Sequence, residues 1–355
     1  MVQTIGMTPN HLLVAVSAVL TPEQAKRLAD ADPRMQILWQ ADMYPPQRFT
    51  GDFGGDPAWR RPPELQAQFD AMCDQANALF GVPDYRPSQL RRCAEANPGL
   101  LWVHTVTAGG GAQVKAAKLA AADLDRITFT TSAGPHAATL AEFAMFGVLA
   151  GAKRLPDLQR DQRAHIWDET MVMRHVKDMT VAVVGMGNIG RLVAQRFLML
   201  GAKVMGVNRT VREVPGVEMH PDHDLASVAA KADALINCLP GTAETEHLIG
   251  ADVLAGAKPG LIVVSLGRGS CIDEAALIDQ LRSGRVGFAA LDVVDREPLA
   301  PDSPLWDLPN VLISPHNMAF GPHIINEVID LFIENAKALL DGRPLRNVMN
   351  KDAFY

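Results

Sequence analysis

The chain has 355 residues, of which 48% are hydrophobic and 21% are charged, and its formal net charge is −7. This composition excludes a disordered chain, and an acidic chain with scattered Lys and Arg argues against a nucleic-acid or anionic-membrane partner. The length favours two domains. Four separated cysteines without zinc spacing predict reduced thiols, no metal site and a cytoplasmic protein. The apolar stretch Leu12–Leu20 is too short to span a bilayer.

Short apolar runs alternate with helical patterns over the first third of the chain. They predict strands over Leu12–Val16, Met35–Trp39, Ala78–Val82, Leu100–Val106 and Ile127–Thr131. This alternation is typical of a parallel sheet covered by helices. After the first strand, Thr21, Pro22 and Gln24 predict a helix start closed by a capping box.

Residues 44–63 interrupt this pattern with a run rich in Pro, Gly and aromatic residues that has no periodicity. We favour an irregular surface insertion here. The alternative is a lid or an oligomer contact, because its aromatic side chains need a surface on which to pack. These side chains are Tyr44, Phe49, Phe53 and Trp59.

A long helical pattern over Ala137–Leu155 leads into a second series of β and α segments. Its strands are expected over Thr180–Val184, Lys203–Val207, Ala234–Cys238, Leu261–Ser265, Phe288–Val293 and Val311–Ser314. Six such strands complete a dinucleotide-binding sheet. A last helix, from about Pro322 to Leu340, is expected to return to the first domain.

The segment from Val181 to Gly190 has the order of a dinucleotide fingerprint: a buried strand, a tight turn and a helix start. Gly185 permits the turn, Gly187 lets the backbone approach a pyrophosphate, and Gly190 lets the helix pack on the strand. Asn188 and Ile189 open the helix, whose free N–H groups and positive dipole end face the phosphates. The simpler interpretation is a glycine-rich turn, which the flanking strand and amphipathic helix make less favourable.

The tip of the next predicted strand reads Asn208-Arg209-Thr210 and carries no carboxylate. An acidic residue there would bind the ribose hydroxyls of NAD, whereas a guanidinium can hold a 2′-phosphate with two hydrogen bonds. Asn208 and Thr210 would add neutral donors. The sequence favours NADP as the cofactor and leaves NAD open, since Arg209 can also be an ordinary surface arginine.

Three further polar residues, Arg268, Glu297 and His316, each come shortly after a predicted strand. Glu297 follows Arg268 by 29 positions, and His316 follows Glu297 by 19. Ligands of open α/β sheets bind at the carboxyl ends of strands. Reduction of a 2-keto acid needs a proton donor, for which His316 is suited, and a cation such as Arg268 for the substrate oxygens. Glu297 would orient the imidazole and favour its charged form.

The Arg268-Gly269 turn, the run from Asp292 to Glu297-Pro298 and the Pro315-His316 pair follow the glycine fingerprint in this order. Together they resemble the D-2-hydroxyacid dehydrogenase family, of the glyoxylate/hydroxypyruvate reductase kind. The resemblance covers nearly the whole second half of the chain.

The resemblance implies further roles. Asp292 would contact the nicotinamide carboxamide, and Leu239-Pro240 would line the cofactor. In the first domain, backbone N–H groups of Ala108, Gly109 and Gly110 would hold the substrate carboxylate, next to Arg268 and His316 as substrate-binding side chains. Residues 133–142 resemble a helix that pairs two subunits, so a homodimer is expected.

The expected architecture is therefore an α/β fold with two domains. A flavodoxin-like substrate domain takes residues 1–132 and is completed by 320–355, and a Rossmann NAD(P)-binding domain takes residues 133–319. The expected activity is hydride transfer between NAD(P)H and a 2-keto acid to give a D-2-hydroxy acid.

Several alternatives stay open. Met318 and Phe320 depart from the small residues usual after the histidine, so a bulkier 2-keto acid is also considered. A phosphite-type or phosphoglycerate-type dehydrogenase remains an alternative, although a phosphoglycerate dehydrogenase with a regulatory domain would need a longer C-terminal region. A non-enzymatic NAD(P)-sensing protein is the alternative of another class. Glu297 argues against a formate-type dehydrogenase, which resembles this pattern with Gln at that position.

Overall fold

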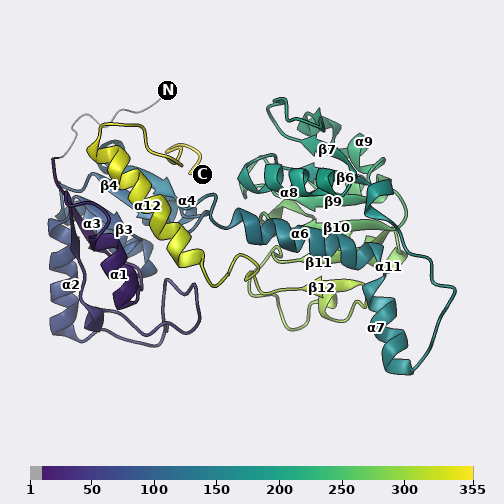
Figure 1. Cartoon of the computed structure of the whole chain (residues 1–355), viewed down its shortest axis with the longest axis horizontal. Coiled ribbons are helices and arrows are strands. Elements are labelled where there is room, and N and C mark those ends of the chain that lie inside the picture. The colour runs from purple at the N-terminus through teal and green to yellow at the C-terminus, as the bar shows by residue number, and fades with distance from the viewer. Residues whose placement is uncertain (1–9, 355) are drawn as a thin grey trace. The chain divides into compact units, whose positions relative to one another are not determined.

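Two parallel β-sheets organise the chain, and each belongs to a different unit (Figure 1). The computed structural model describes residues 10–354. One unit contains the residues up to His136 together with those from Phe320 onward, and the other runs from Ala137 to Ala319. The boundary expected between residues 132 and 133 lies just before this division. None of the helices formed by residues 10–354 is long and apolar enough to cross a membrane.

The sheet of the first unit has five parallel strands in the order β2-β1-β3-β4-β5. The strands are β1 (Leu12–Val16), β2 (Met35–Leu38), β3 (Ala78–Phe80), β4 (Trp102–Thr105) and β5 (Thr128–Thr131). This order is that of flavodoxin-like sheets, in which the strand order reverses beside the first strand. All five expected strands are present, and each end lies within two residues of its predicted position.

Helices cover both faces of this sheet. They are α1 (Pro22–Ala29), α2 (Pro63–Gln75), α3 (Pro87–Ala96), α4 (Gly111–Ala117), α5 (Ala121–Arg126) and α12 (Ile324–Leu340). Apolar residues of α2, α3 and α4 pack on one face, and those of α1 and α12 pack on the other. Thr21 forms the predicted capping box with Gln24 at the start of α1. The last helix begins at Ile324 rather than at Pro322.

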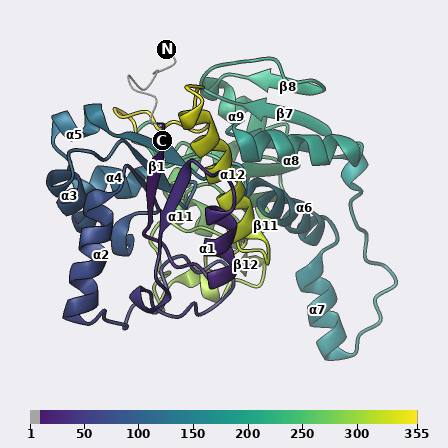
Figure 2. The same cartoon turned by 60° about the vertical axis from the view of Figure 1, so that its left-hand side comes forward.

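Figure 2 shows α12, drawn in yellow, running along the strands of the first unit although it comes from the end of the sequence. Phe332 of α12 stacks on Trp102 of β4, with 4.5 Å between the ring centroids. The return of the chain to the first unit therefore completes its hydrophobic core.

The sheet of the second unit has seven parallel strands in the order β12-β11-β10-β9-β6-β7-β8. They are β6 (Thr180–Val184), β7 (Lys203–Val207), β8 (Val217–His220), β9 (Ala234–Asn237), β10 (Leu261–Ser265), β11 (Val286–Leu291) and β12 (Val311–Ile313). Counted from β6, this is the doubly wound order 3-2-1-4-5-6 with one more strand at the far edge. The six expected strands are present, and β8 is a seventh strand that was not predicted.

The missed strand β8 has the sequence VEMH and lies at the edge of the sheet, where all four residues are half-buried or exposed. Its residues alternate between apolar and polar, but this alternation covers only four positions, the shortest run for which the pattern indicates a strand. Its parallel pairing with β7 establishes it as a strand.

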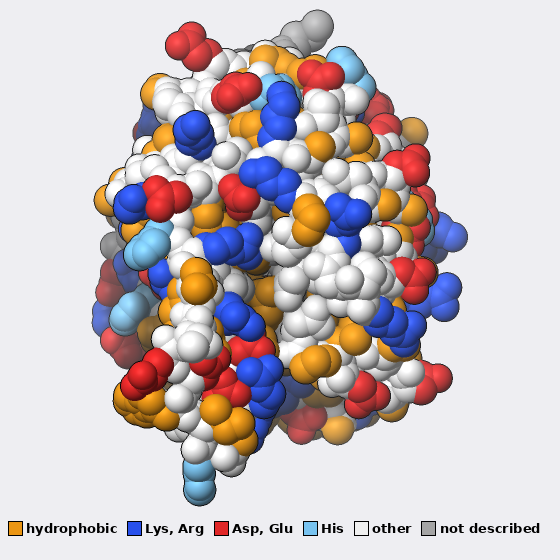
Figure 3. Space-filling model, turned by 90° about the vertical axis from the view of Figure 1, so that its right-hand side faces the viewer, with side chains coloured by type: hydrophobic (Ala, Val, Ile, Leu, Met, Phe, Trp, Pro, Cys, Tyr) orange, Lys and Arg blue, Asp and Glu red, His pale blue; other side chains and the backbone are white. Residues whose placement is uncertain are grey.

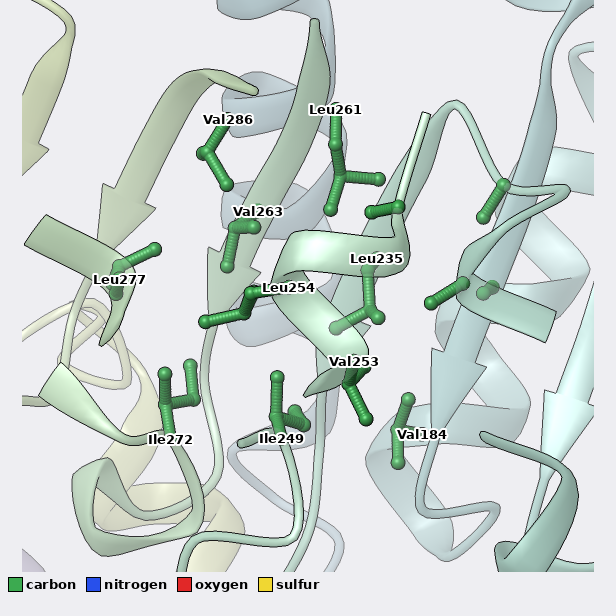
Figure 4. Packing of buried hydrophobic residues seen from close by; sticks show 14 of the residues in the cluster. Val184, Leu235, Ile249, Val253, Leu254, Leu261, Val263, Ile272, Leu277 and Val286 are labelled. Carbon is green, nitrogen blue, oxygen red and sulfur yellow. The ribbon is translucent and has the colours of Figure 1, made fainter. Parts of the chain in front are cut away.

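The helices of this unit also lie on both faces of its sheet. They are α6 (Ala137–Ala152), α7 (Leu155–Ala164), α8 (Asn188–Met199), α9 (Leu225–Ala229), α10 (Ala251–Gly256) and α11 (Glu274–Ser283). Residues of α6 and α8 fill one core, and residues of α9, α10 and α11 fill the other. Figure 4 shows the second core, with Val253 and Leu254 of α10 facing Leu235, Val263 and other strand residues.

Residues 44–63 form an ordered segment around one buried carboxylate. Asp52 accepts hydrogen bonds from the backbone and guanidinium of Arg48 and from the backbone N–H groups of Gly54 and Gly55. Its aromatic residues find partners within the first unit: Tyr44 and Phe53 are buried, and Phe49 packs against Phe320 with ring centroids 5.4 Å apart. The segment lacks regular secondary structure for most of its length but is held by its own polar core.

Candidate active site

The three predicted catalytic residues follow three neighbouring strands of one sheet. Arg268 follows β10, Glu297 follows β11 and His316 follows β12, and these strands are adjacent and parallel. The carboxyl ends of parallel strands lie along one edge of a sheet, so the three segments emerge on the same side. All three belong to the second unit.

Glu297 and His316 are in direct contact. The Nδ1 atom of His316 lies 2.7 Å from Oε2 of Glu297. A carboxylate only accepts hydrogen bonds, so Nδ1 must carry a proton and donate it. The other ring nitrogen, Nε2, is then the atom that can lose or gain a proton, and it can serve as a base when neutral and as an acid when charged.

The turn that carries His316 is built around the buried carboxylate of Asp292. Its Oδ1 accepts hydrogen bonds from the hydroxyl of Ser314 at 2.7 Å and from the backbone N–H groups of Asn317 at 3.0 Å and Met318 at 3.2 Å. The N–H of His316 donates to the backbone oxygen of Asp292 at 2.9 Å. His316 has a φ of 54°, a left-handed conformation that non-glycine residues adopt at a cost, and these bonds hold it there.

The segment around Arg268 is fixed by close backbone packing. A Cβ on Gly267 would lie 2.3 Å from the backbone oxygen of Leu239, and a Cβ on Gly269 would lie 1.9 Å from the backbone of Val294. The buried side chain of Asn237 adds a hydrogen bond from Nδ2 to the backbone oxygen of Arg268, at 3.0 Å. Only glycines on either side allow this turn, and the Arg268 side chain is exposed at its apex.

The glycine turn between β6 and α8 has the geometry that the fingerprint predicts. Gly185 has a φ of 97°, which favours glycine, and a Cβ on Gly190 would lie 2.0 Å from the backbone oxygen of Gly185. A Cβ on Gly187 would meet no protein atom within 4 Å, so packing within the described chain does not require glycine there. A pyrophosphate that approaches the backbone would require it.

The first turn of α8 offers donors to such a ligand. Within residues 10–354, the N–H groups of Gly187, Asn188 and Ile189 donate no backbone hydrogen bond, and Gly187 makes no side-chain cap. A helix of this length leaves its first N–H groups to an anion or to water. These residues therefore fit the phosphates of a dinucleotide.

Asn208 links the tip of β7 to the glycine turn. Its Oδ1 accepts from the N–H of Met186 at 3.2 Å, and its Nδ2 donates to the backbone oxygen of Thr210 at 3.0 Å. Asn208, which we predicted to be a phosphate donor, thus uses its side chain to hold the backbone of Met186 and Thr210. Arg209 and Thr210 are exposed at the strand tip. A hydrogen bond from Thr242 lowers the pKa of Glu244, and the charge of Arg209 lowers it further by a smaller amount.

The segment after β9 is also anchored at Asn237. Leu239 is buried and donates its N–H to Oδ1 of Asn237 at 3.1 Å, whereas Pro240 is exposed. The backbone oxygen of Pro240 accepts from the hydroxyl of Thr245 at 2.6 Å. The structure thus brings the Leu239-Pro240 segment next to the Arg268 turn, through their common partner.

The predicted substrate loop lies in the first unit, after β4. It is a tight turn in which the N–H of Gly110 donates to the backbone oxygen of Thr107 at 3.3 Å. Within residues 10–354, the N–H groups of Ala108 and Gly109 donate no hydrogen bond. They are suited to bind a carboxylate, and that role stays a prediction.

Sequence reasoning missed two positioning residues, Asn237 and Ser314, and assigned Asp292 only a cofactor contact. A polar residue at the buried end of an apolar strand was the available signal, since a buried polar group must have hydrogen-bond partners. Which partners it has depends on the neighbouring strands. Among residues 10–354, no group of three or more His, Cys, Asp or Glu side chains is arranged to hold a metal ion.

Comparison with known proteins extends these observations. A family model described as the NAD-binding domain of D-isomer specific 2-hydroxyacid dehydrogenases matches residues 145–318. A D-3-phosphoglycerate dehydrogenase of Mycobacterium leprae (strain TN) is 36% identical over 217 residues, which are 60% of this chain and 40% of that protein. The match thus spans less than half of that relative.

Two further proteins are similar over more of their length. Glyoxylate/hydroxypyruvate reductase B of Pectobacterium carotovorum subsp. carotovorum (strain PC1) is 34% identical over 218 residues, 60% of this chain and 68% of that protein. The crystal structure of a D-isomer specific 2-hydroxyacid dehydrogenase from Xanthobacter autotrophicus Py2, in complex with NADPH and MES, has a TM-score of 0.76 and 28% identity and covers 97% of this chain and 99% of that one. With the glycine turn and the Glu297–His316 pair, these similarities show that the chain belongs to the D-isomer specific 2-hydroxyacid dehydrogenase family.

Proposed function

We propose that this protein catalyses the NADPH-dependent reduction of a 2-keto acid to a D-2-hydroxy acid. The observation that carries the proposal is the 2.7 Å contact between Nδ1 of His316 and Oε2 of Glu297. The two side chains are 43% and 38% exposed, and an ion pair of that exposure adds little to stability. A role in proton transfer accounts for the pair better than a role in folding.

The residues of the site have distinct roles in the proposed reaction. NADPH, when bound, supplies a hydride to the keto carbon. His316 donates its Nε2 proton to the keto oxygen during reduction and takes a proton during oxidation. Glu297 accepts the hydrogen bond from Nδ1 and thereby fixes the orientation of the ring. Arg268 binds the substrate carboxylate or the keto oxygen and polarises it, and the N–H groups of Ala108 and Gly109 help to hold the carboxylate.

The proposed cofactor site begins at the glycine turn. The N–H groups at the start of α8 would bind the pyrophosphate, and Arg209 would bind the 2′-phosphate of NADP, with Thr210 as a further donor. At the other end of the cofactor, Asp292 would contact the nicotinamide carboxamide, and Leu239 and Pro240 would line the ring. The similar Xanthobacter enzyme was crystallised with NADPH, which supports this choice. NAD would bind in the same way but without the phosphate contact.

Glyoxylate or hydroxypyruvate is the substrate that we favour, by similarity to the Pectobacterium reductase. The alternative is a phosphorylated 2-hydroxy acid, which the similarity to the mycobacterial phosphoglycerate dehydrogenase supports. Phe320 supports a bulkier 2-keto acid, because its side chain is 45% exposed although it contacts Phe49.

The most informative experiment is a panel of substrates with both reduced cofactors. Oxidation of NADPH and NADH is followed with glyoxylate, hydroxypyruvate, 3-phosphohydroxypyruvate and branched or aromatic 2-keto acids. We expect turnover of at least one 2-keto acid, a higher kcat/KM with NADPH, and a product of D configuration. Tight NADPH binding without turnover of any substrate would instead favour a cofactor-sensing protein, and turnover of phosphite with NADP would favour the phosphite-type alternative.

We further propose that the protein is a cytoplasmic homodimer. The segment 133–142, which resembles the pairing helix of the family, buries Ala137, Leu140 and Ala141 in its own core. Apolar side chains that remain exposed follow it along α6, α7 and the loop after α7: Phe146, Leu158, Ile166, Trp167 and Val172. Figure 3, viewed from the side of α7, shows apolar side chains among the charged ones on this face. Trp167 is 89% exposed, which supports burial in a subunit contact.

A further inference from the structure

A second histidine, His104, is fully buried in the first unit. It lies on β4 and has no exposed surface. Its ring packs near Phe80, Trp102 and Phe332, with centroids 6.3, 6.0 and 5.6 Å away. Burial without a charged partner lowers the pKa of His104 to about 3. The side chain is therefore a neutral hydrogen-bonding group in an aromatic environment.

Both ring nitrogens of His104 have a hydroxyl partner on β5 or just after it. Nδ1 lies 2.8 Å from Oγ1 of Thr130, and Nε2 lies 3.0 Å from Oγ of Ser132. Oγ1 of Thr130 also accepts the indole N–H of Trp102 at 2.8 Å, and Oγ of Ser132 also donates to the backbone oxygen of Thr105 at 2.9 Å.

The two ends of this chain of hydrogen bonds fix its direction. Trp102 can only donate and the oxygen of Thr105 can only accept. The single proton of Ser132 goes to Thr105, so Nε2 of His104 must donate to Ser132. Nδ1 is then the acceptor, and it takes the proton of Thr130. Only the neutral Nε2–H tautomer lets every group in the chain form its bond; with a proton on Nδ1, the hydroxyl of Thr130 would have no acceptor among these partners.

The chain ends at the backbone that begins the Thr107–Gly110 loop. The N–H of Ser132 donates to the backbone oxygen of Thr107 at 3.2 Å. The hydroxyl of Thr105 lies between two acceptors, the same oxygen of Thr107 at 3.2 Å and the backbone oxygen of Thr130 at 3.3 Å. A Cβ on Gly110 would lie 1.9 Å from Oγ1 of Thr105, so the loop folds closely over this residue. The loop thus rests on Thr105 and Ser132, which His104 connects to the core.

We propose that His104 is a positioning residue, which uses the one-way chain from Trp102 through Thr130 and Ser132 to fix the Thr107–Gly110 loop in the conformation that binds the substrate carboxylate. The inference rests on the proposed function for the use of the loop, and on the hydrogen bonds of His104 for its mechanism. It assigns His104 no contact with substrate or cofactor.

The first test of the proposal compares two substitutions on β5. Thr130→Val removes the acceptor of Trp102 and the donor to His104. Thr128→Val makes the same change in shape at a buried threonine of the same strand that is not part of the chain. We expect Thr130→Val and Ser132→Ala to raise the KM of the 2-keto acid at least about tenfold, with a smaller change in kcat and an unchanged Kd of NADPH, because a loosened loop weakens carboxylate binding. Thr128→Val should leave all three values unchanged. A KM within twofold of the wild type in both Thr130→Val and Ser132→Ala would overturn the proposal.

A second set of measurements does not depend on catalysis. Nitrogen NMR of labelled histidine should show a His104 ring in the neutral Nε2–H form that does not titrate between pH 5 and 8. Amide hydrogen exchange at residues 106–111 should be faster in Thr130→Val than in Thr128→Val. An Nδ1–H tautomer or unchanged exchange would overturn the inference, even if the protein reduced no 2-keto acid. If the wild-type protein shows no turnover but has the Nε2–H tautomer and the faster exchange in Thr130→Val, the proposed function is wrong and the role of His104 in holding the loop still stands.

Discussion

Among single residues, the two histidines His104 and His316 show how surroundings decide what an imidazole can do. His316 is 43% exposed and has a carboxylate on Nδ1, so its other nitrogen can exchange a proton with a substrate. His104 is fully buried between neutral hydroxyls, and burial lowers its pKa to about 3. The first is suited to proton transfer and the second to holding a fixed geometry.

The pKa of His104 predicts a pH dependence of stability. The folded chain keeps the ring neutral, whereas the unfolded chain binds a proton below the ordinary pKa of 6.5. As the pH falls below 6.5, the unfolded state therefore gains protons, and the free energy of unfolding declines by up to about 1.4 kcal/mol per pH unit from this residue. The replacement His104→Gln removes this contribution. Urea unfolding at pH 7 and 4.5 should show that the stability difference between wild type and variant narrows at the lower pH; a constant difference would contradict the lowered pKa.

Arg209 carries the prediction of cofactor choice. Arg209→Asp replaces the cation by a charge that repels a 2′-phosphate and can accept from ribose hydroxyls. We expect the KM of NADPH to rise about 10- to 100-fold, as for loss of a charge-assisted contact, and the preference to move towards NADH. Arg212→Asp, an exposed arginine three positions later, is the control for net charge. Equal effects of the two variants, or unchanged selectivity in Arg209→Asp, would refute the assignment.

At the scale of elements, the site consists of turns that depend on neighbouring strands. Asp292 directly follows β11 and holds the His316 turn after β12, and Asn237 ends β9 and holds the Arg268 turn after β10. Each polar side chain is buried, and each fixes a segment that is distant in the sequence. The rigid sheet thereby positions the exposed reactive side chains.

The Ser314 hydroxyl tests this support of the His316 turn. Ser314→Ala removes the 2.7 Å hydrogen bond to Asp292 without touching the imidazole. We expect a loss of about 1 kcal/mol of stability and about a tenfold lower kcat, with an unchanged Kd of NADPH, because a small displacement of the acid slows proton transfer. Ser303→Ala, at another buried serine of the same unit, should lower stability without this loss of kcat. Equal kcat in the two variants would remove Ser314 from the positioning of His316.

The strands and the glycine turn could be predicted from the sequence because their signals are local. Buried strands such as Thr180–Val184 are continuous apolar runs, and the bounds of that strand were predicted correctly. The edge strand Val217–His220 was not predicted, because its alternation of apolar and polar residues covers only four positions, and its pairing with β7 is not visible in the local sequence. The roles of Asn237 and Asp292 could not be predicted, since Asn237 holds Arg268 at a separation of 31 residues and Asp292 holds Asn317 at a separation of 25.

For the whole molecule, the proposed homodimer predicts a change of mass when its apolar contact is removed. The double variant Leu158→Asp with Trp167→Asp places two charges among exposed apolar side chains of α7 and the loop that follows it. We expect light scattering to show a dimer for the wild type and a monomer for this variant, because charge in an apolar interface is not compensated. Met199→Asp is the control, since Met199 is 79% exposed on α8. A wild-type protein that is monomeric at high concentration would contradict the homodimer.

The central claim is that His316, oriented by Glu297, transfers the proton in an NADPH-dependent reduction of a 2-keto acid. The most direct measurement compares wild type and His316→Ala, with kcat for the best 2-keto acid and Kd for NADPH determined on the same preparations. The account predicts a kcat lower by about 100- to 10,000-fold and an NADPH affinity within about twofold of the wild type, because the imidazole acts in the transition state and does not hold the cofactor. A variant with near-normal turnover would contradict it.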